Sequence, residues 1–345
     1  MKAAVLEELN RPLKFYDLMI PKLEYGQVLV KIFYSGLCHS QLMEVRGKRG
    51  EDKYLPHLLG HEATAEVIEI GIGVKKVKKG DKVILTWIQA NGIDANPPKY
   101  LYNDKIINAG KVTTFNEYAI VSENRVVLLP EGLPLDVGVL FGCAIPTGMG
   151  IVMNQLKPKS GSRVAIFGLG GIGMSALLAI KFFEPSMLIA VDIEDKKLEL
   201  AKEFGATNLI NANKDESSLV KNIKDISNGG VDYVVEATGL SRMIEKGFEA
   251  LSRTGTIIFA SHPKYGDKIS IDPFDLIAGK RILGSWGGAT NPDVDIPKFV
   301  KFYIEKKIPL EKMVSKPYEL DEINQALDDL EDRKILRGLI KINGK

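Results

Sequence analysis

The sequence predicts an α/β protein with two domains, and three observations support this fold class. At 345 residues the chain is too long for one typical domain and short for three. From Met1 to about Val127, short runs of alternating hydrophobicity are separated by turn residues, which is typical of a largely β, barrel-like domain. From about Gly161 the pattern changes to alternating strands and helices, which predicts a doubly wound parallel sheet covered on both faces.

The strands expected in the first domain have apolar residues at every second position. They are residues 3–8, 27–36, 64–71, 81–87, 115–122 and 125–130. Residues 89–112 show no clear period, and we interpret them as a surface lobe or loop.

In the second domain, unbroken apolar strands alternate with helical stretches. The strands are expected at 163–168, 187–192, 207–212, 231–238 and 255–261, with helices at 171–183, 195–205, 218–226 and 241–253. The last strand is expected to be an edge strand that pairs with a second copy across a two-fold axis. The tail from about Ile296 has amphipathic helical stretches and no further strand–helix alternation, so we assign it to the first domain. The predicted domains are therefore 1–148 with 287–345, and an inserted α/β domain at 149–286.

Charge and composition exclude several functions. The 46 basic and 44 acidic side chains give a formal charge of +2 without a dense basic run beside aromatic residues, so nucleic acid is not an expected partner. No apolar run is long enough to span a bilayer, and the N-terminal stretch lacks the pattern of a signal peptide. We therefore expect a cytoplasmic protein whose two cysteines are thiols or metal ligands and do not form a disulfide.

A glycine-rich motif lies between the first strand and the first helix of the α/β domain. This position lets backbone N–H groups and the helix N-terminus face a pyrophosphate. The motif consists of Gly168, Leu169, Gly170, Gly171, Ile172 and Gly173. It predicts a dinucleotide site, although a tight turn alone would give the same residues.

The next strand ends in an acidic residue, Asp192, at the spacing expected for a carboxylate that binds the ribose hydroxyls. Such a carboxylate repels a 2′-phosphate, so NAD(H) is favoured over NADP(H). The alternative is that Asp192 caps the helix that begins near Asp195. Lys197, one helical turn further, is expected either to reach the same ribose or to be a solvated helix residue.

Three residues could hold a metal ion. Catalytic zinc sites use three Cys, His or carboxylate ligands and leave one position open. Cys38, His61 and Cys143 would form a Cys₂His set, and both cysteines lie in glycine-bordered segments. Two buried thiols and one hydrogen-bonded histidine are the alternative. We interpret His57 as a loop residue and not as a ligand.

Seven segments resemble the zinc-dependent medium-chain alcohol dehydrogenases in their order, their spacing and the residues they contain. The segments are 36–40, 60–83, 141–150, 164–173, 189–207, 227–239 and 338–342. The resemblance extends over nearly the whole chain. It implies a GroES-like catalytic β-barrel, a Rossmann domain that binds NAD(H), and an oxidoreductase that is usually a homodimer or homotetramer.

The resemblance also assigns roles to individual residues. Cys38, His61 and Cys143 match the catalytic zinc ligands, and Glu62 matches an acid near or transiently on the metal. Ser40 matches the hydroxyl that bonds the substrate alcohol.

Other matches concern the cofactor and the substrate pocket. His39 and Arg337 match basic positions that meet the cofactor pyrophosphate. Thr147 matches a residue that packs against the nicotinamide, and Trp87 falls at a position that lines the substrate pocket.

The sequence departs from the family pattern at three places. No cysteine occurs between Asp81 and Tyr118, so one catalytic zinc per chain and no structural zinc is expected. Gln41 replaces an aspartate that orients the ligand histidine, which predicts weaker zinc retention because the amide adds no charge. A histidine that ends the proton relay of some members is absent near Met43.

The predicted function is a zinc-dependent, NAD(H)-linked alcohol dehydrogenase that interconverts a small alcohol and its aldehyde or ketone. The polar residues of the 91–104 insert suggest a polyol or sugar-derived substrate. Two alternatives remain: a zinc-free quinone or enoyl reductase of the same superfamily, and a non-catalytic NAD(H)-binding sensor.

Overall fold

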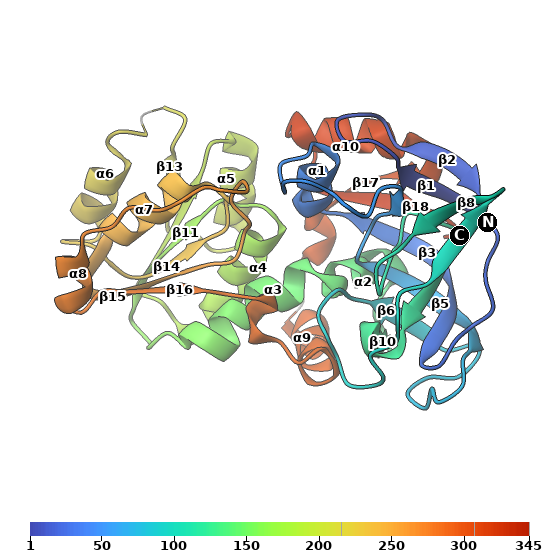
Figure 1. The fold of residues 1–345 in the computed structure, drawn as a ribbon. Helices are drawn as coiled ribbons and strands as arrows, with labels where there is room; N and C mark the ends of the chain where they lie inside the picture. The colour runs from blue at the N-terminus through green and yellow to red at the C-terminus, as the bar shows by residue number, and fades with distance from the viewer. Residues whose placement is uncertain (215, 307, 345) are drawn as a thin grey trace. The chain divides into compact units, whose positions relative to one another are not determined.

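The chain folds into two compact units, which a computed structural model describes for residues 1–214, 216–306 and 308–344. The split unit consists of Met1–Cys143 and Asn291–Lys345, and the inserted unit of Ala144–Thr290 (Figure 1). The prediction that the α/β domain is an insertion agrees with this division. Three positions of the predicted domains, 215, 307 and 345, lie outside the described residues.

The boundaries differ from the predicted ones because helix α3 (Ala144–Gly150) packs within the inserted unit. A Cβ atom added at Gly148 would lie 2.3 Å from the carbonyl oxygen of Ile172, and one at Gly150 would lie 2.5 Å from that of Gly288. These close approaches assign residues 144–148 and 287–290 to the inserted unit.

The split unit is built from two sheets. Its described strands are β1 (Lys2–Leu6), β2 (Lys14–Asp17), β3 (Gln27–Leu37), β4 (His57–Leu58), β5 (Ala63–Ile70), β6 (Lys82–Leu85), β7 (Lys99–Tyr102), β8 (Lys105–Asn108), β9 (Tyr118–Ser122), β10 (Val126–Leu128), β17 (Val314–Glu319) and β18 (Arg337–Lys341). One sheet has the order β2-β1-β4-β8-β7 and the other β10-β6-β5-β3-β18-β17, with β9 also paired to β3. All six strands expected here are present, and the strand-like end of the tail is β18, whereas β2, β4, β7, β8 and β17 were missed.

The helices of the split unit are short apart from the two in the tail. They are α1 (His39–Val45), η1 (Glu123–Arg125), α2 (Leu135–Gly138), η2 (Val139–Gly142), α9 (Pro292–Lys306), η6 (Leu310–Met313), η7 (Leu320–Glu322) and α10 (Ile323–Glu331). Strand β18 runs antiparallel to β3, with Gly338 opposite Leu37. The end of the chain is thereby placed beside Cys38, which directly follows β3.

The inserted unit is a parallel six-stranded sheet with helices between successive strands. Its strands are β11 (Arg163–Phe167), β12 (Met187–Asp192), β13 (Asn208–Asn211), β14 (Val231–Glu236), β15 (Leu251–Phe259) and β16 (Arg281–Gly284). Its helices are α3, η3 (Ile151–Leu156), α4 (Gly171–Ile180), η4 (Lys181–Phe183), α5 (Asp195–Glu203), α6 (Leu219–Ile226), α7 (Ser241–Glu249), α8 (Pro273–Ile277) and η5 (Gly287–Ala289). The order β13-β12-β11-β14-β15-β16 is that of the doubly wound dinucleotide-binding fold.

One expectation for this sheet is wrong. Residues 255–261 were expected to form an edge strand, but β15 is covered by β16, with Thr256 opposite Arg281. The four residues of β16 are mostly exposed and carry little apolar periodicity. The sequence pattern therefore gave no signal for this outer strand.

The lobe at residues 89–112 is partly regular, which corrects its interpretation as a loop. It contains the β7–β8 hairpin, in which Tyr100 lies opposite Ile107. Both side chains are fully buried, and the Tyr100 hydroxyl accepts a hydrogen bond from the N–H of Ile120 at 2.8 Å. The lobe is thus anchored by an ordinary apolar core.

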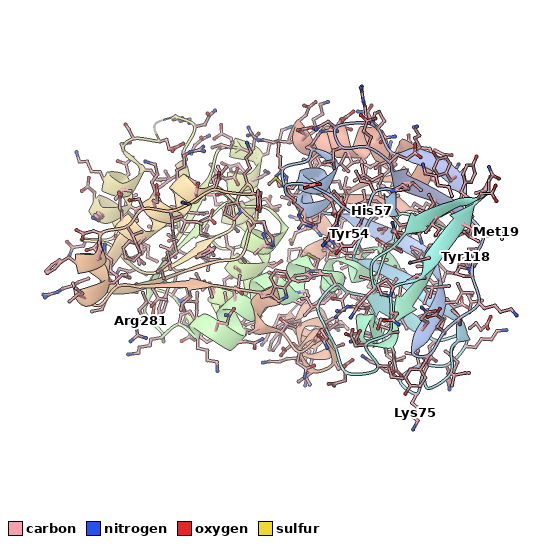
Figure 2. The ribbon with its side chains drawn as sticks, viewed as in Figure 1. Met19, Tyr54, His57, Lys75, Tyr118 and Arg281 are labelled. Atoms are coloured by element: carbon pink, nitrogen blue, oxygen red, sulfur yellow. The ribbon has the colours of Figure 1, made fainter. Side chains whose placement is uncertain are left out.

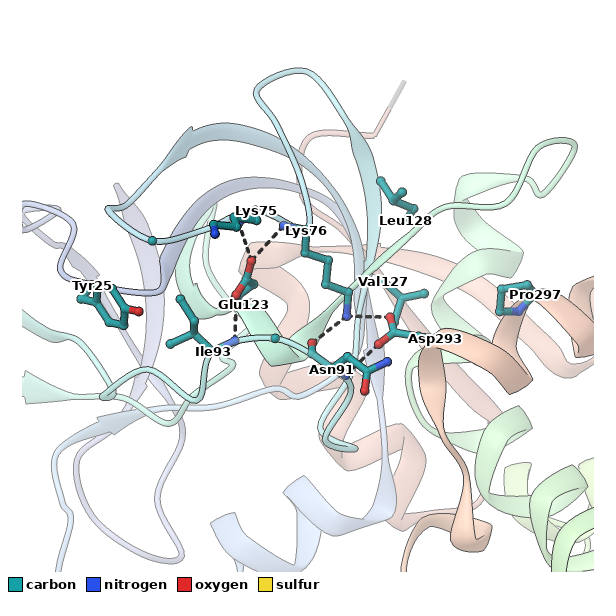
Figure 3. Close-up of a pocket in the computed structure, with 12 residues that line it drawn as sticks. Tyr25, Lys75, Lys76, Asn91, Ile93, Glu123, Val127, Leu128, Asp293 and Pro297 are labelled. Atoms are coloured by element: carbon teal, nitrogen blue, oxygen red, sulfur yellow. Dashed lines mark hydrogen bonds and ion pairs between the residues drawn. The ribbon is translucent and has the colours of Figure 1, made fainter.

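Glu123 anchors the start of the lobe through backbone hydrogen bonds. Its carboxylate accepts hydrogen bonds from the N–H groups of Lys75, Lys76 and Ile93 at 2.7, 2.9 and 2.7 Å (Figure 3). Burial alone would raise the pKa of Glu123, but these three donors outweigh it and lower the pKa. The carboxylate therefore stays ionised in this position.

An ion pair also joins the residues next to the lobe to helix α9 in the tail. Lys76 Nζ lies 2.6 Å from Asp293, and Asp293 accepts a hydrogen bond from the N–H of Asn91 at 2.7 Å. These side chains line a hollow of about 970 Å³ (Figure 3). The lobe at Asn91, the turn at Lys76 and the tail at Asp293 are therefore connected by hydrogen bonds and an ion pair.

Glu123→Gln should lower the free energy of unfolding of the split unit by about 1–3 kcal/mol, because the amide group places N–H donors against backbone donors. Chemical denaturation measures this change, with the exposed Glu131→Gln as the matched control. Equal stability of the two variants would contradict the anchoring role.

In the inserted unit, Glu236 ends β14 as a fully buried carboxyl. Its Oε1 accepts a hydrogen bond from the N–H of Thr238 at 2.7 Å, while Oε2 has no hydrogen-bond partner among the described residues. Burial raises the pKa of Glu236 to about 7. Folding is therefore favoured most when this group is protonated.

The pH dependence follows from linkage. An unfolded chain ionises Glu236 near pH 4.5 and the folded chain near 7, so stability falls as pH rises between these values. Relative to Glu236→Gln, the wild type should lose up to about 3 kcal/mol of unfolding free energy between pH 5 and pH 8. Denaturation at both pH values measures it, with the exposed Glu199→Gln as control. A pH-independent difference would contradict the assignment.

Among the described residues, no single helix is long and apolar enough to cross a membrane. The consecutive helical segments Leu135–Gly142 and Ala144–Leu156 reach that length and hydropathy only when taken together.

Candidate active site

The split unit brings the three predicted metal ligands together. Cys38 follows β3, His61 lies just before β5, and Cys143 follows η2. Strands β3 and β5 are antiparallel with Ser35 opposite Ala63, so the pairing sets the first two ligands side by side. The two sulfurs and a His61 ring nitrogen all lie within 4.8 Å of one another. These separations match three corners of a tetrahedral zinc site.

The chemistry of the cluster fits a divalent cation. His61 Nε2 is buried with no hydrogen-bond partner among the described residues, and a bound cation would occupy its lone pair. The hydrogen bond with Cys143 lowers the pKa of Cys38 well below its usual value, while the same bond and burial raise that of Cys143. One sulfur is thus favoured as a thiolate, and the second ionises on metal binding.

Glu62 and Arg337 form a buried ion pair next to the sulfurs. Burial raises the pKa of Glu62, against the pull of Arg337. Burial alone would lower the pKa of Arg337, but Glu62 and the two cysteines raise it, so the guanidinium stays charged. Glu62 Oε2 has no hydrogen-bond partner among the described residues, which suits an acid that approaches the metal.

Two glycines make room for this acid, and sequence reasoning missed their role. A Cβ atom at Gly36 would lie 2.5 Å from the Glu62 carboxyl carbon, and one at Gly142 would lie 2.7 Å from the Glu62 Cβ. Each glycine lies close to a cysteine ligand in the sequence. The glycine-bordered cysteine segments were therefore the available signal.

Gln41 and Ser40 contact the other side of His61. Gln41 is buried, its Oε1 accepts a hydrogen bond from the N–H of Cys38 at 3.0 Å, and its amide nitrogen contacts His61 Nδ1. Ser40 Oγ lies 3.5 Å from the same nitrogen. When Nε2 binds a metal, Nδ1 carries the proton and needs an acceptor. Ser40 Oγ or a rotated Gln41 amide can supply one.

Gln41→Leu should speed zinc loss to a chelator by about 10–100-fold, because the imidazole loses its orienting partner. Gln41→Asp should slow it, since a carboxylate accepts the Nδ1 proton and adds charge. Zinc release followed with a chromogenic chelator measures both rates. Identical rates in the three proteins would show that Gln41 does not orient His61.

The remaining site residues of the split unit occupy distinct positions. His39 begins α1 and is exposed. The Trp87 ring lies 6.4 Å from that of His61 in an edge arrangement, and its place in a substrate pocket stays a prediction. Arg337 is directed to Glu62, so its contact with a pyrophosphate stays a prediction, as does that of His39.

The glycine-rich turn of the inserted unit has the conformation that its sequence predicts. Gly168 has φ +84°, which side chains rarely adopt. A Cβ at Gly173 would lie 1.8 Å from the carbonyl oxygen of Gly168, whereas one at Gly170 would meet nothing within 4 Å. The turn is tight on its inner side and open at Gly170, the N-cap of α4. Leu169, Gly171 and Ile172 complete the turn and the first residues of α4.

Asp192 ends β12 and binds this turn. One carboxylate oxygen accepts a hydrogen bond from the N–H of Leu169 at 2.6 Å, and the other accepts from Ile193 and Glu194 at 2.8 and 3.0 Å. Asp192 does not cap α5, whose N-cap is Glu194, but its carboxylate orders the two residues that precede the helix. Its ribose contact stays a prediction.

Two further predicted cofactor residues lie in the inserted unit. Thr147 is buried in α3, and its hydroxyl has no hydrogen-bond partner among the described residues. Lys197 is half-buried in the first turns of α5. Their cofactor contacts are not tested by this geometry.

Known protein families match residues in both units of the chain. Residues 24–131 match the alcohol dehydrogenase GroES-like domain family, and residues 171–305 match the zinc-binding dehydrogenase family. A class-3 alcohol dehydrogenase of Oryza sativa subsp. japonica is 32% identical over 98% of this chain and 96% of its own length. The chain belongs to the zinc-type medium-chain dehydrogenase/reductase family.

Solved structures of this family superpose along the whole chain. An alcohol dehydrogenase zinc-binding domain protein from Burkholderia ambifaria has a TM-score of 0.90 at 32% identity, covering 99% of this chain and 98% of its own. Benzyl alcohol dehydrogenase from Acinetobacter calcoaceticus has a TM-score of 0.87 at 32% identity, covering 99% of both chains. The protein is therefore an oxidoreductase of the alcohol dehydrogenase type.

Proposed function

We propose that the protein oxidises a small alcohol, or reduces its carbonyl, with one catalytic zinc per chain held by Cys38, His61 and Cys143. The observation that carries this proposal is the convergence of the two sulfurs and a His61 ring nitrogen within 4.8 Å, together with a buried His61 Nε2 that has no hydrogen-bond partner among the described residues. Zinc in this site supplies a Lewis acid that lowers the pKa of the alcohol, and NAD(H) supplies the hydride acceptor or donor.

The chain's own residues orient and balance this site. Ser40, next to the His61 ring, offers the hydroxyl that bonds the substrate oxygen. Glu62 keeps one oxygen on Arg337 and the other available to the metal. Met43 is buried where some family members carry a histidine, so we propose that the proton leaves through the cofactor ribose and water.

The cofactor proposal is NAD(H), bound by the Gly168–Gly173 turn and Asp192. The open N-terminus of α4 suits the pyrophosphate, and the carboxylate at the end of β12 disfavours a 2′-phosphate. Homo-oligomeric assembly and a cytoplasmic location stay predictions.

Two substrate classes are distinguishable. The polar 91–104 insert favours a polyol or sugar-derived alcohol. Trp87, 6.4 Å from the His61 ring, favours an apolar or aromatic alcohol, and one similar structure is named as a benzyl alcohol dehydrogenase. A panel of polyols, aliphatic alcohols and benzyl alcohol decides between them by kcat/KM; strict preference for the last two would exclude the polyol.

Cys143→Ala should lose its tightly held zinc, and alcohol-dependent NAD reduction should fall to background, because a two-ligand site does not retain the metal. Elemental analysis and turnover assays measure both. Ser40→Ala is the matched control, which should keep its zinc and lose turnover.

NADH binding should survive in Cys143→Ala, since the glycine-rich turn belongs to the inserted unit. Wild-type protein without zinc or alcohol-dependent activity would favour the zinc-free reductase or the NAD(H)-binding sensor. Zinc retained by Cys143→Ala would exclude Cys143 as a ligand.

A further inference from the structure

A second group of ligand-type side chains lies elsewhere in the split unit. Glu44 comes from the last turn of α1, His57 from β4, and Asp52 from the segment between them. One ligand atom of each lies within 4.8 Å of the others. Figure 2 labels His57 and Tyr54, and the N–H of Tyr54 donates a hydrogen bond to Asp52 Oδ1 at 2.9 Å. The sequence interpretation of His57 as a plain loop residue did not anticipate this convergence.

The direction of the hydrogen bonds identifies a place for a cation. His57 Nδ1 lies 2.9 Å from the carbonyl oxygen of Leu58, which can only accept, so Nδ1 carries a proton. In the neutral ring, Nε2 is then a lone-pair acceptor. It faces Asp52 Oδ2 at 2.8 Å and Glu44 Oε1 at 3.9 Å. Three acceptors converge, and such an arrangement is stable only with a proton or a metal ion among them.

Because these three side chains are largely buried, their convergence is energetically unfavourable unless a proton or a metal ion lies among them. The exposed fractions of the His57, Asp52 and Glu44 side chains are 9%, 13% and 27%. Arg49 lies 3.6 Å from Glu44 Oε2 and is 41% exposed, so it faces the outer oxygen of Glu44. The inner oxygen and the Asp52 carboxylate remain directed at the imidazole.

We propose that Glu44, Asp52 and His57 form a second divalent-metal site that takes Zn²⁺ or Mn²⁺. One imidazole and two carboxylates are a nitrogen and oxygen set that suits these ions. The set contains no sulfur, which separates it chemically from the Cys₂His cluster.

The site would connect the two segments that carry catalytic ligands. Helix α1 begins directly after Cys38 and ends with Glu44 in its last turn, while β4 lies shortly before His61. A metal ion bound by Glu44 and His57 fixes the far ends of both segments. We therefore expect metal binding to raise the melting temperature of the protein.

Mn²⁺ is the probe that tests the site, because it binds the weakest of the first-row ions and does not displace zinc from thiolates. Protein loaded only with its Cys143-dependent zinc is titrated with MnCl₂, and free Mn²⁺ is followed by electron paramagnetic resonance. We expect one Mn²⁺ per chain, together with a higher melting temperature.

Asp52→Asn and Glu44→Gln should each weaken Mn²⁺ binding at least about tenfold. The Asn side chain keeps the acceptor for the Tyr54 N–H, so the loop should fold. The exposed Asp104→Asn is the matched control and should bind as the wild type. Retained zinc and an unchanged circular dichroism spectrum establish that each variant is folded.

Two results would overturn the proposal. One is wild-type protein that binds no Mn²⁺, which would make the cluster a charged histidine paired with Asp52. The other is binding that is unaffected in both Asp52→Asn and Glu44→Gln, which would place the ion elsewhere.

Discussion

The catalytic cluster depends on the balance of buried charge around Glu62 and Arg337. An isolated ionised group costs several kcal/mol in a protein interior, and removing one partner of a buried pair leaves the other uncompensated. With the proposed zinc bound, two thiolates and Glu62 would carry three negative charges, which Arg337 and the divalent cation would neutralise. Arg337 begins β18, whose pairing with β3 sets it beside Cys38. Strand β18, which follows the inserted unit in the sequence, therefore supplies the positive charge that this buried site requires.

Paired charge and backbone donors also order the lobe, which contains no cysteine. Glu123 accepts three backbone N–H groups, and Lys76 with Asp293 joins the turn to the tail. Tyr100 and Ile107 add a buried apolar contact. The lobe is thus ordered by interactions available to any folded chain, and the loss of the cysteines does not imply loss of structure. The Glu44–Asp52–His57 group lies in a different segment and does not substitute for them.

In the inserted unit, backbone geometry contributes more than side chains do. The open N-terminus of α4 and the positive φ of Gly168 form the turn, and Asp192 holds it by accepting the Leu169 N–H. Glu236 introduces a buried acid at the end of a neighbouring strand, at a cost that rises with pH. The unit therefore combines a tight glycine turn with a carboxyl group whose protonation affects its stability.

The sequence by itself determined the two-domain α/β architecture, the inserted position of the parallel sheet, and the candidates Cys38, His61, Cys143 and Gly168–Gly173. These features depend on local periodicity, on glycine conformation and on the rarity of cysteine, which a single chain displays directly. Tertiary structure alone decided the outer strand β16, the Glu62–Arg337 pair, and the meeting of Glu44 and Asp52 with His57. The residues in those contacts are not spaced in the sequence by the regular intervals of a helix or a strand, so only the folded chain reveals that they meet.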